Sequence, residues 1–170
     1  MELTVMDEKF QITLAEATPA DVEDMVLLIR ELAAYEQAPL EATITAQDLL
    51  RDGFGPRPFF HALLARVNAQ TVGMAFWYYT YSTWKGKVLY LEDLIVREPW
   101  RGKGIGQKLF EELLRIAAKN EVKRMQWQVL HWNEPALAFY RKYQAAFSHE
   151  WLNGMLTEDK IKYWVEKLHL

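Results

Sequence analysis

Residues 101–114 read RGKGIGQKLFEELL, and this stretch is the most informative feature of the chain. An apolar run at 88–96 precedes it and predicts a β-strand, while apolar residues at helical spacing occur within and after it. Glycines let backbone N–H groups approach a ligand closely, and the N-terminus of a helix favours negative charge. The order of strand, glycine-rich basic turn and helix therefore predicts a site for a phosphorylated ligand.

Composition narrows the class of protein. The chain has 170 residues, of which 51% are hydrophobic and 25% charged, so we expect one globular domain over 1–170. A net charge of −3 argues against a nucleic-acid partner. The absence of cysteine excludes disulfides, a thiolate metal site and a cysteine nucleophile, and it fits a cytoplasmic protein. No apolar run approaches the roughly 18 residues of a membrane span, and residues 1–10 lack the apolar core of a signal peptide.

Periodicity along the chain alternates between strands and helices. Strands are predicted at 12–17, 59–66, 71–81, 88–96, 125–130 and 151–156. Helices are predicted at 22–35, 46–51, from the glycine turn to about 120, from 133 to about 143, and at 158–168. Thr18 and Thr45 are candidate N-caps of the first two helices. This mixture predicts an α/β or α+β fold around one central sheet.

Three kinds of phosphate loop compete for the glycine turn. A P-loop requires Lys and Ser or Thr after its last glycine, which this chain lacks. A dinucleotide fingerprint belongs on the first strand–helix turn and has a different glycine spacing. The remaining pattern is Arg/Gln-x-x-Gly-x-Gly/Ala, which Arg101, Gly104 and Gly106 satisfy. It resembles the acetyl-CoA pyrophosphate loop of the GNAT N-acetyltransferases, although a glycine turn that merely caps a helix is the alternative.

The flanking segments extend the resemblance. LYLEDL at 89–94, WNEP at 132–135 and Phe139-Tyr140 follow the GNAT order and spacing. Further segments resemble the spermidine/spermine (diamine) N-acetyltransferase group: ELAAYE at 31–36, DLLRDGFG at 48–55, PFFH at 58–61, and 78–84. The resemblance covers roughly 12–151. It implies a GNAT fold, with a single mixed, mostly antiparallel sheet, helices on both faces and splayed central strands. It also implies a homodimer without metal.

The resemblance implies a binding site for acetyl-CoA as co-substrate. The pantetheine arm would lie between the strand that carries Leu94, Ile95 and Val96 and the strand at 125–130. The pyrophosphate would be held by backbone N–H groups of the loop, with charge from two of its side chains. The loop residues concerned are Arg101, Gly102, Lys103, Gly104, Ile105 and Gly106. The start of the later helix would complete the site with Asn133, Glu134, Pro135, Ala136 and Tyr140.

Two acids, Glu92 and Asp93, interrupt the apolar strand. An unpaired buried carboxylate is costly, and alternation along a strand places neighbours on opposite faces, so one acid must reach solvent or a site. The structural alternatives are a bulge or a salt bridge. In the group that the chain resembles, the acid matching Glu92 faces the amine. A primary alkylamine with a pKa of about 10.4 arrives protonated, so a carboxylate there can remove its proton, through water.

Tyr140 is the second catalytic candidate. In GNAT enzymes the matching tyrosine lies beside the thioester sulfur and acts as general acid for the departing thiolate. Periodicity alone favours a core tyrosine on an amphipathic helix. Asn133 likewise has two interpretations, as a contact to the cofactor and as an N-cap.

Residues that would bind the substrate follow from the resemblance. These are Tyr35, Glu36, Trp84, Gln126, Trp127 and Gln128, together with Glu92. A solvated helix end is the alternative for Tyr35 and Glu36. The chain departs from the group at His131, at Gln144 and at 148–151, all near the substrate pocket. The acceptor is therefore expected to be a diamine, a polyamine or a lysine-like diamino acid. A protein, peptide or antibiotic amine remains open, as does a non-catalytic acyl-CoA-binding module.

Overall fold

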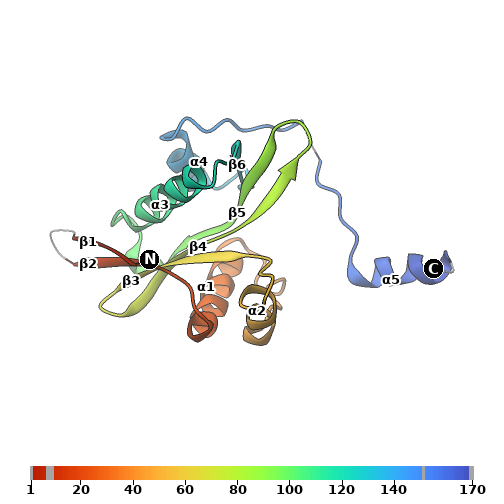
Figure 1. Cartoon of the computed structure of the whole chain (residues 1–170), viewed down its shortest axis with the longest axis horizontal. Coiled ribbons are helices and arrows are strands. Elements are labelled where there is room, and N and C mark those ends of the chain that lie inside the picture. The colour runs from red at the N-terminus through yellow and green to blue at the C-terminus, as the bar shows by residue number, and fades with distance from the viewer. Residues whose placement is uncertain (1, 7–9, 151, 169–170) are drawn as a thin grey trace. The chain divides into compact units, whose positions relative to one another are not determined.

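The computed structural model describes residues 2–6, 10–150 and 152–168 (Figure 1). The chain divides into two compact units, 1–130 and 131–170. The first unit contains strands β1 (Glu2–Met6), β2 (Gln11–Glu16), β3 (His61–Val67), β4 (Gln70–Ser82), β5 (Gly86–Val96) and β6 (Arg124–Gln126). Its helices are α1 (Val22–Tyr35), α2 (Ala46–Gly53) and α3 (Ile105–Lys119), with 3₁₀ turns at Pro19–Asp21 and Glu98–Trp100.

The six strands form one sheet in the order β1-β2-β3-β4-β5-β6. All neighbours pair antiparallel except β5 and β6, which are parallel. This confirms the mixed, mostly antiparallel sheet. Strand β1 was not predicted, because five residues after a chain start carry too short a pattern to show alternation.

Helices cover both faces of this sheet, as expected. Figure 1 shows α1 and α2 on one face and α3 on the other. The core under α1 joins Met25 and Leu28 to strand residues Leu64, Met74 and Ile95. These three strand residues face α1 because cross-strand partners point the same way: Leu64 lies opposite Met74, and Met74 opposite Ile95. We call this side of the sheet the α1 face.

The central strands β5 and β6 diverge. They pair only where Val88, Leu89 and Tyr90 lie beside Arg124, Met125 and Gln126. The predicted strand at 125–130 is therefore too long, because the chain after Gln126 no longer follows β5 and forms no ladder with it in the described structure. The second half of β5, from Leu91 to Val96, continues past this divergence, which is the splay that the resemblance implied.

The second unit contains α4 (Glu134–Arg141) and α5 (Glu158–Lys167). Both helices were predicted. The predicted strand at 151–156 is wrong for residues 152–156, which form no strand in the described structure, and Trp151 lies outside the described residues. A strand needs a partner for its backbone N–H and C=O groups, whereas Leu152 and Met155 are 97% and 90% exposed here. Among the described residues no helix has the length and apolar character needed to cross a membrane.

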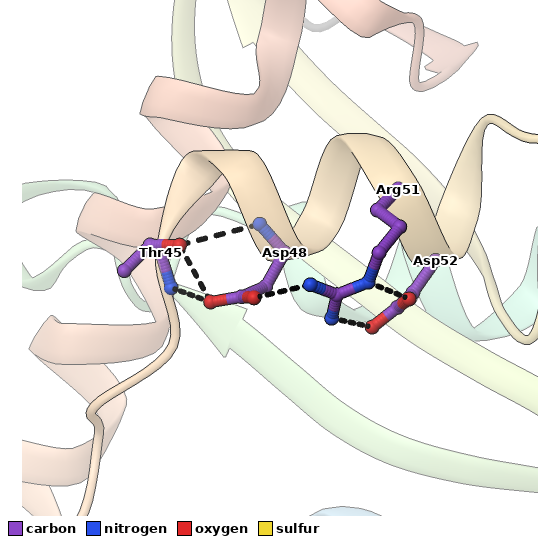
Figure 2. A network of polar contacts seen from close by, with 4 residues as sticks. All are labelled: Thr45, Asp48, Arg51 and Asp52. Atoms are coloured by element: carbon purple, nitrogen blue, oxygen red, sulfur yellow. Dashed lines mark hydrogen bonds and ion pairs between the residues drawn. The ribbon is translucent and has the colours of Figure 1, made fainter.

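Helix α2 begins at the predicted cap (Figure 2). The Thr45 hydroxyl accepts a hydrogen bond from the Asp48 N–H at 3.2 Å, and the Asp48 carboxylate accepts one from the Thr45 N–H at 3.1 Å. Arg51 then pairs with both Asp48 and Asp52. The reciprocal cap satisfies N–H groups that the first helical turn leaves unpaired. The helix runs to Gly53, two residues beyond the predicted end.

Thr45→Ala should lower the free energy of unfolding by about 1 kcal/mol, because the N-cap acceptor is lost. In a domain of this size that corresponds to a fall in Tm of roughly 2–4 °C, measurable by calorimetry. Thr43→Ala, at an exposed loop threonine just before the helix, is the matched control and should change Tm by much less. Equal changes in both variants would contradict a stabilising cap.

Candidate active site

A β-bulge lies at Glu92. On β4, Phe76 is opposite Asp93 and Trp77 is opposite Leu91, so Glu92 is the extra residue of β5. A bulge leaves one residue out of the ladder, bends the strand and re-aims side chains. The bulge that the sequence left open as an explanation for the paired acids is therefore present.

The bulge turns both acids to the same face. Asp93 shares the α1 face because its partner, Phe76, packs against the core there. Glu92 accepts a hydrogen bond from the hydroxyl of Tyr78, at 2.9 Å from its Oε2, and Tyr78 also packs against that core. The expectation that Glu92 and Asp93 point to opposite faces is wrong, because strict alternation holds only in a regular strand.

Three carboxyls influence one another on this face. The pKa of Asp93 is raised to about 7, chiefly by burial and also by the charges of Glu92 and Glu36. Partial burial also raises the pKa of Glu36, which follows directly after α1. Like charges at close range disfavour joint ionisation. The α1 face at the bulge therefore attracts cations, and Asp93 is a member that sequence reasoning did not assign to the site.

The glycine loop has the backbone that its sequence requires. Gly102 and Gly104 have φ of +72° and +75°, in the left-handed region that favours glycine, and α3 begins directly afterwards. A Cβ added at either position would meet no protein atom within 4 Å, so both α-carbons border open space. N–H groups in the first turn of a helix have no partner within that helix. The loop therefore fits an anionic group such as a pyrophosphate.

The two basic side chains of the loop lie close to it. The Arg101 Nε donates to the Val96 carbonyl at 3.0 Å, and the guanidinium lies 4.7 Å from the centre of the Tyr35 ring. The Lys103 ammonium lies 4.6 Å from the centre of the Trp100 ring. Cations over aromatic faces are attracted by the ring quadrupole. Both charges thus stay beside the loop.

The end of α1 is joined to the end of β5 and to the loop. Arg101 contacts Tyr35, and Arg97 forms an ion pair with Glu31 at 3.2 Å. Tyr35, predicted as a substrate residue, thereby lies next to a predicted cofactor residue. The segment that carries Glu36 is held to the segment that carries the glycine turn.

The remaining substrate candidates of the first unit occupy different places. Trp84 lies at the β4–β5 hairpin and is 84% exposed. Gln126 pairs with Tyr90, which stacks on Tyr78, so its position is on the α1 face. Trp127 instead packs edge-to-face on Phe110 of α3, with ring centres 5.7 Å apart. Gln128 is exposed, and contact of these side chains with a substrate stays a prediction.

The second unit contains the predicted helix start and Tyr140. The Asn133 side chain accepts from the Ala136 N–H at 3.3 Å, which confirms it as the N-cap of α4, with Pro135 in the first turn. Glu134 forms an ion pair with Arg141 at 3.2 Å. Tyr140 is 7% exposed, as the core interpretation expected. The roles of these residues toward acetyl-CoA stay predictions.

Comparison with known proteins identifies relatives. The model of the acetyltransferase (GNAT) family matches residues 25–145. A human spermidine/spermine N(1)-acetyltransferase-like protein 1 is 44% identical over 147 residues, covering 82% of this chain and 21% of the relative. The thialysine N-epsilon-acetyltransferase of Bos taurus is 36% identical over 138 residues, covering 76% and 81%. The chain thus spans about a fifth of the first relative's length and about four fifths of the second's.

Solved structures share the fold. An integron cassette protein from V. cholerae superimposes with a TM-score of 0.74 at 22% identity, covering 91% of this chain and 98% of that one. An aminoglycoside acetyltransferase from an uncultured soil sample gives a TM-score of 0.71 at 19% identity, covering 86% and 95%. At these identities the likeness establishes the fold alone.

Asp93→Asn should stabilise the protein more at pH 8 than at pH 5. The raised pKa of about 7 means that the folded state keeps the Asp93 proton over a range in which the unfolded state, with an ordinary value of 3.8, has lost it. Stability from this group is therefore lost as the pH rises from about 4 to about 7. The gain in Tm at pH 8 should exceed that at pH 5 by at least about 2–4 °C, the shift for 1 kcal/mol.

The control for this measurement is Glu41→Gln, which neutralises an exposed loop carboxyl. It should change Tm equally at the two pH values. If Asp93→Asn also gave the same gain at both, the assignment of a raised pKa to Asp93 would be wrong.

Proposed function

Because this chain belongs to the GNAT family of acetyltransferases, we propose that it transfers the acetyl group of acetyl-CoA directly to a primary amine. The acceptor is a diamine, a polyamine or a lysine-like diamino acid. The observation that carries this acceptor class is the acidic α1 face at the bulge, where the charges of Glu92 and Glu36 both reach Asp93. A dication suits this face, since one ammonium can lie at Glu92 while another is held by the remaining acids.

The relatives support the same class of acceptor. They are named spermidine/spermine N(1)-acetyltransferase-like protein and thialysine N-epsilon-acetyltransferase, and both match most of this chain. The negative net charge of −3 is compatible with a cationic substrate.

The donor side of the proposal rests on the glycine loop and on β5. Backbone N–H groups of residues 101–106 bind the pyrophosphate, and the charges of Arg101 and Lys103 add to the attraction. The second half of β5, with Leu94, Ile95 and Val96, borders the place where β6 diverges, and the pantetheine arm occupies that opening. Acetyl-CoA supplies the thioester whose carbonyl carbon the amine attacks.

Glu92 prepares the amine. An alkylammonium with a pKa of about 10.4 has no free electron pair near neutral pH, so it must lose a proton before it can attack. Glu92 first holds the ammonium by charge and then takes its proton, through a water molecule. The C–N bond then forms as the C–S bond of the thioester breaks, without an acyl-enzyme, and the chain has no cysteine to form a cysteinyl one.

Tyr140 serves the leaving group. A phenol with a pKa of about 10 can donate a hydrogen bond or a proton to a thiolate whose acid has a pKa of about 8.5. The transfer is slightly uphill, so the hydrogen bond contributes the larger share. Asn133, besides capping α4, contacts the pantetheine arm together with Glu134, Pro135 and Ala136.

Assembly and location complete the proposal. The two compact units form one acetyltransferase domain, a view supported by a family match at 25–145 that spans both. A homodimer follows from the resemblance to the polyamine acetyltransferases.

The absence of cysteine is compatible with a cytoplasmic location. No group of three or more metal-binding side chains occurs among the described residues, and the chemistry proposed here uses none.

We expect the purified chain to acetylate putrescine, spermidine or thialysine, with release of CoA, in preference to a peptide N-terminus or an aminoglycoside. The measurement is CoA release across this panel of amines, with the product identified by mass spectrometry. Acetylation of the peptide or the aminoglycoside, with no acetylation of any diamine, would overturn the acceptor assignment.

Glu92→Gln should lower kcat by roughly 10²-fold or more, the usual contribution of a general base.

Tyr140→Phe should lower kcat by roughly 10²-fold while leaving acetyl-CoA affinity unchanged, because only the hydroxyl at the leaving group is lost. Calorimetric titration with CoA and steady-state kinetics separate the two effects. Tyr143→Phe, two residues after α4, is the matched control and should change kcat by less than about twofold. An unchanged kcat in Tyr140→Phe would remove the general-acid role.

A further inference from the structure

The direction of Glu92 is not set by the sheet. In a regular strand, pairing on both sides fixes where each side chain points, but Glu92 is the extra residue between Leu91 and Asp93, which have partners on β4. Its side chain is also exposed. A glutamate in this situation samples several rotamers unless another group holds its carboxylate.

Tyr78 is the group that holds it. Its hydroxyl donates to Glu92 Oε2 at 2.9 Å, across 14 residues of sequence. The Tyr78 ring is itself fixed: it stacks on Tyr90 of β5, with ring centres 5.2 Å apart and planes at 24°, and it packs against the core under α1. The phenol is therefore a rigid donor that reaches the bulge from the neighbouring strand.

The Tyr78 hydroxyl is a donor suited to a carboxylate on this face. Glu92 lies beside Asp93, and the charges of Glu92 and Glu36 both act on the Asp93 carboxyl. A hydrogen bond donated to a carboxylate favours its charged form. Burial raises the pKa of Tyr78, and the hydrogen bond to Glu92 raises it further, so the hydroxyl keeps its proton and remains a donor.

We propose that Tyr78 is a positioning residue of the reaction, which fixes one oxygen of Glu92 and leaves the other directed at the substrate ammonium and its water. The inference rests on the proposed function of Glu92 as the base. No proton moves to or from Tyr78. The proton of the ammonium passes to Glu92, and Tyr78 sets the geometry and the charge of the acceptor.

A double-mutant cycle tests the coupling. Tyr78→Phe should lower kcat/KM roughly 10-fold or more, as expected for a hydrogen bond to a charged group. In a Glu92→Gln background the change Tyr78→Phe should lower kcat/KM by less than about threefold, because Tyr78 acts through the carboxylate. A full loss in both backgrounds would show a role independent of Glu92 and overturn the proposal.

The pH profile supplies a second readout that a merely structural role would not move. In Tyr78→Phe the fall of kcat/KM on the acid side should move to higher pH, because a hydrogen bond that favours the charged carboxylate is lost. Tyr79→Phe is the matched control. Tyr79 points to the opposite face of the sheet, where the centres of its ring and of the His61 ring are 5.8 Å apart. This variant should leave kcat/KM and its pH profile unchanged. An unshifted profile in Tyr78→Phe contradicts the proposal.

The contact is also testable without any substrate. In protein labelled with [¹³Cζ]tyrosine, Glu92→Gln should move the Tyr78 resonance, assigned by its loss in Tyr78→Phe, and should leave that of Tyr79 in place. A stationary Tyr78 resonance would refute the inference even if the wild type acetylates diamines. Conversely, a shifted resonance in a protein that acetylates none of the panel would uphold the Tyr78–Glu92 contact and refute the proposed function.

Discussion

The bulge at Glu92 is the constraint on which the arrangement of the site depends. Continuous pairing of β4 with β5 would send Glu92 and Asp93 to opposite faces, and one of them into the packing under α3. The extra residue turns both to the α1 face, at the cost of one position in the ladder. The Glu92 side chain thereby comes within hydrogen-bonding distance of Tyr78. Residues 93–96 of β5 remain paired with β4, so the strand continues toward the glycine loop.

Charge repulsion is built into the face that this bulge creates. Burial and the neighbouring carboxylates raise the pKa of Asp93 to about 7, so the protein without a bound cation is less stable than its neutral variant would be. Such strain is common where function requires groups that the fold alone would not bring together. A bound cation would relieve this repulsion, and differential stabilisation of this kind would favour a dication over a neutral amine.

The end of α1 connects the two halves of the site in the first unit. Tyr35 lies under the Arg101 guanidinium, and Glu31 pairs with Arg97, so the helix that presents Glu36 is attached to the segment that leads into the loop. A displacement of the loop would therefore also displace the end of α1, next to Glu36. After Tyr90, β5 no longer pairs with β6, so the edge of the second half of β5 that would face β6 has no ladder partner there among the described residues.

Local sequence determined much of this protein. The glycine loop with its helix α3 and the caps at Thr45 and Asn133 rest on signals within a few residues, and Glu92 stands out as an acid in an apolar strand. The catalytic candidate Tyr140 rests on the family resemblance, because local periodicity indicates only a core residue. Tertiary structure alone decided the bulge, the short β6 and the absence of a strand at 152–156, because strand pairing depends on a partner elsewhere in the chain. It also brought in Tyr78 and Asp93. The Tyr78 hydroxyl on β4 reaches the Glu92 carboxylate on β5 only once the two strands have paired with the bulge between them, and that pairing joins residues that are not neighbours along the chain.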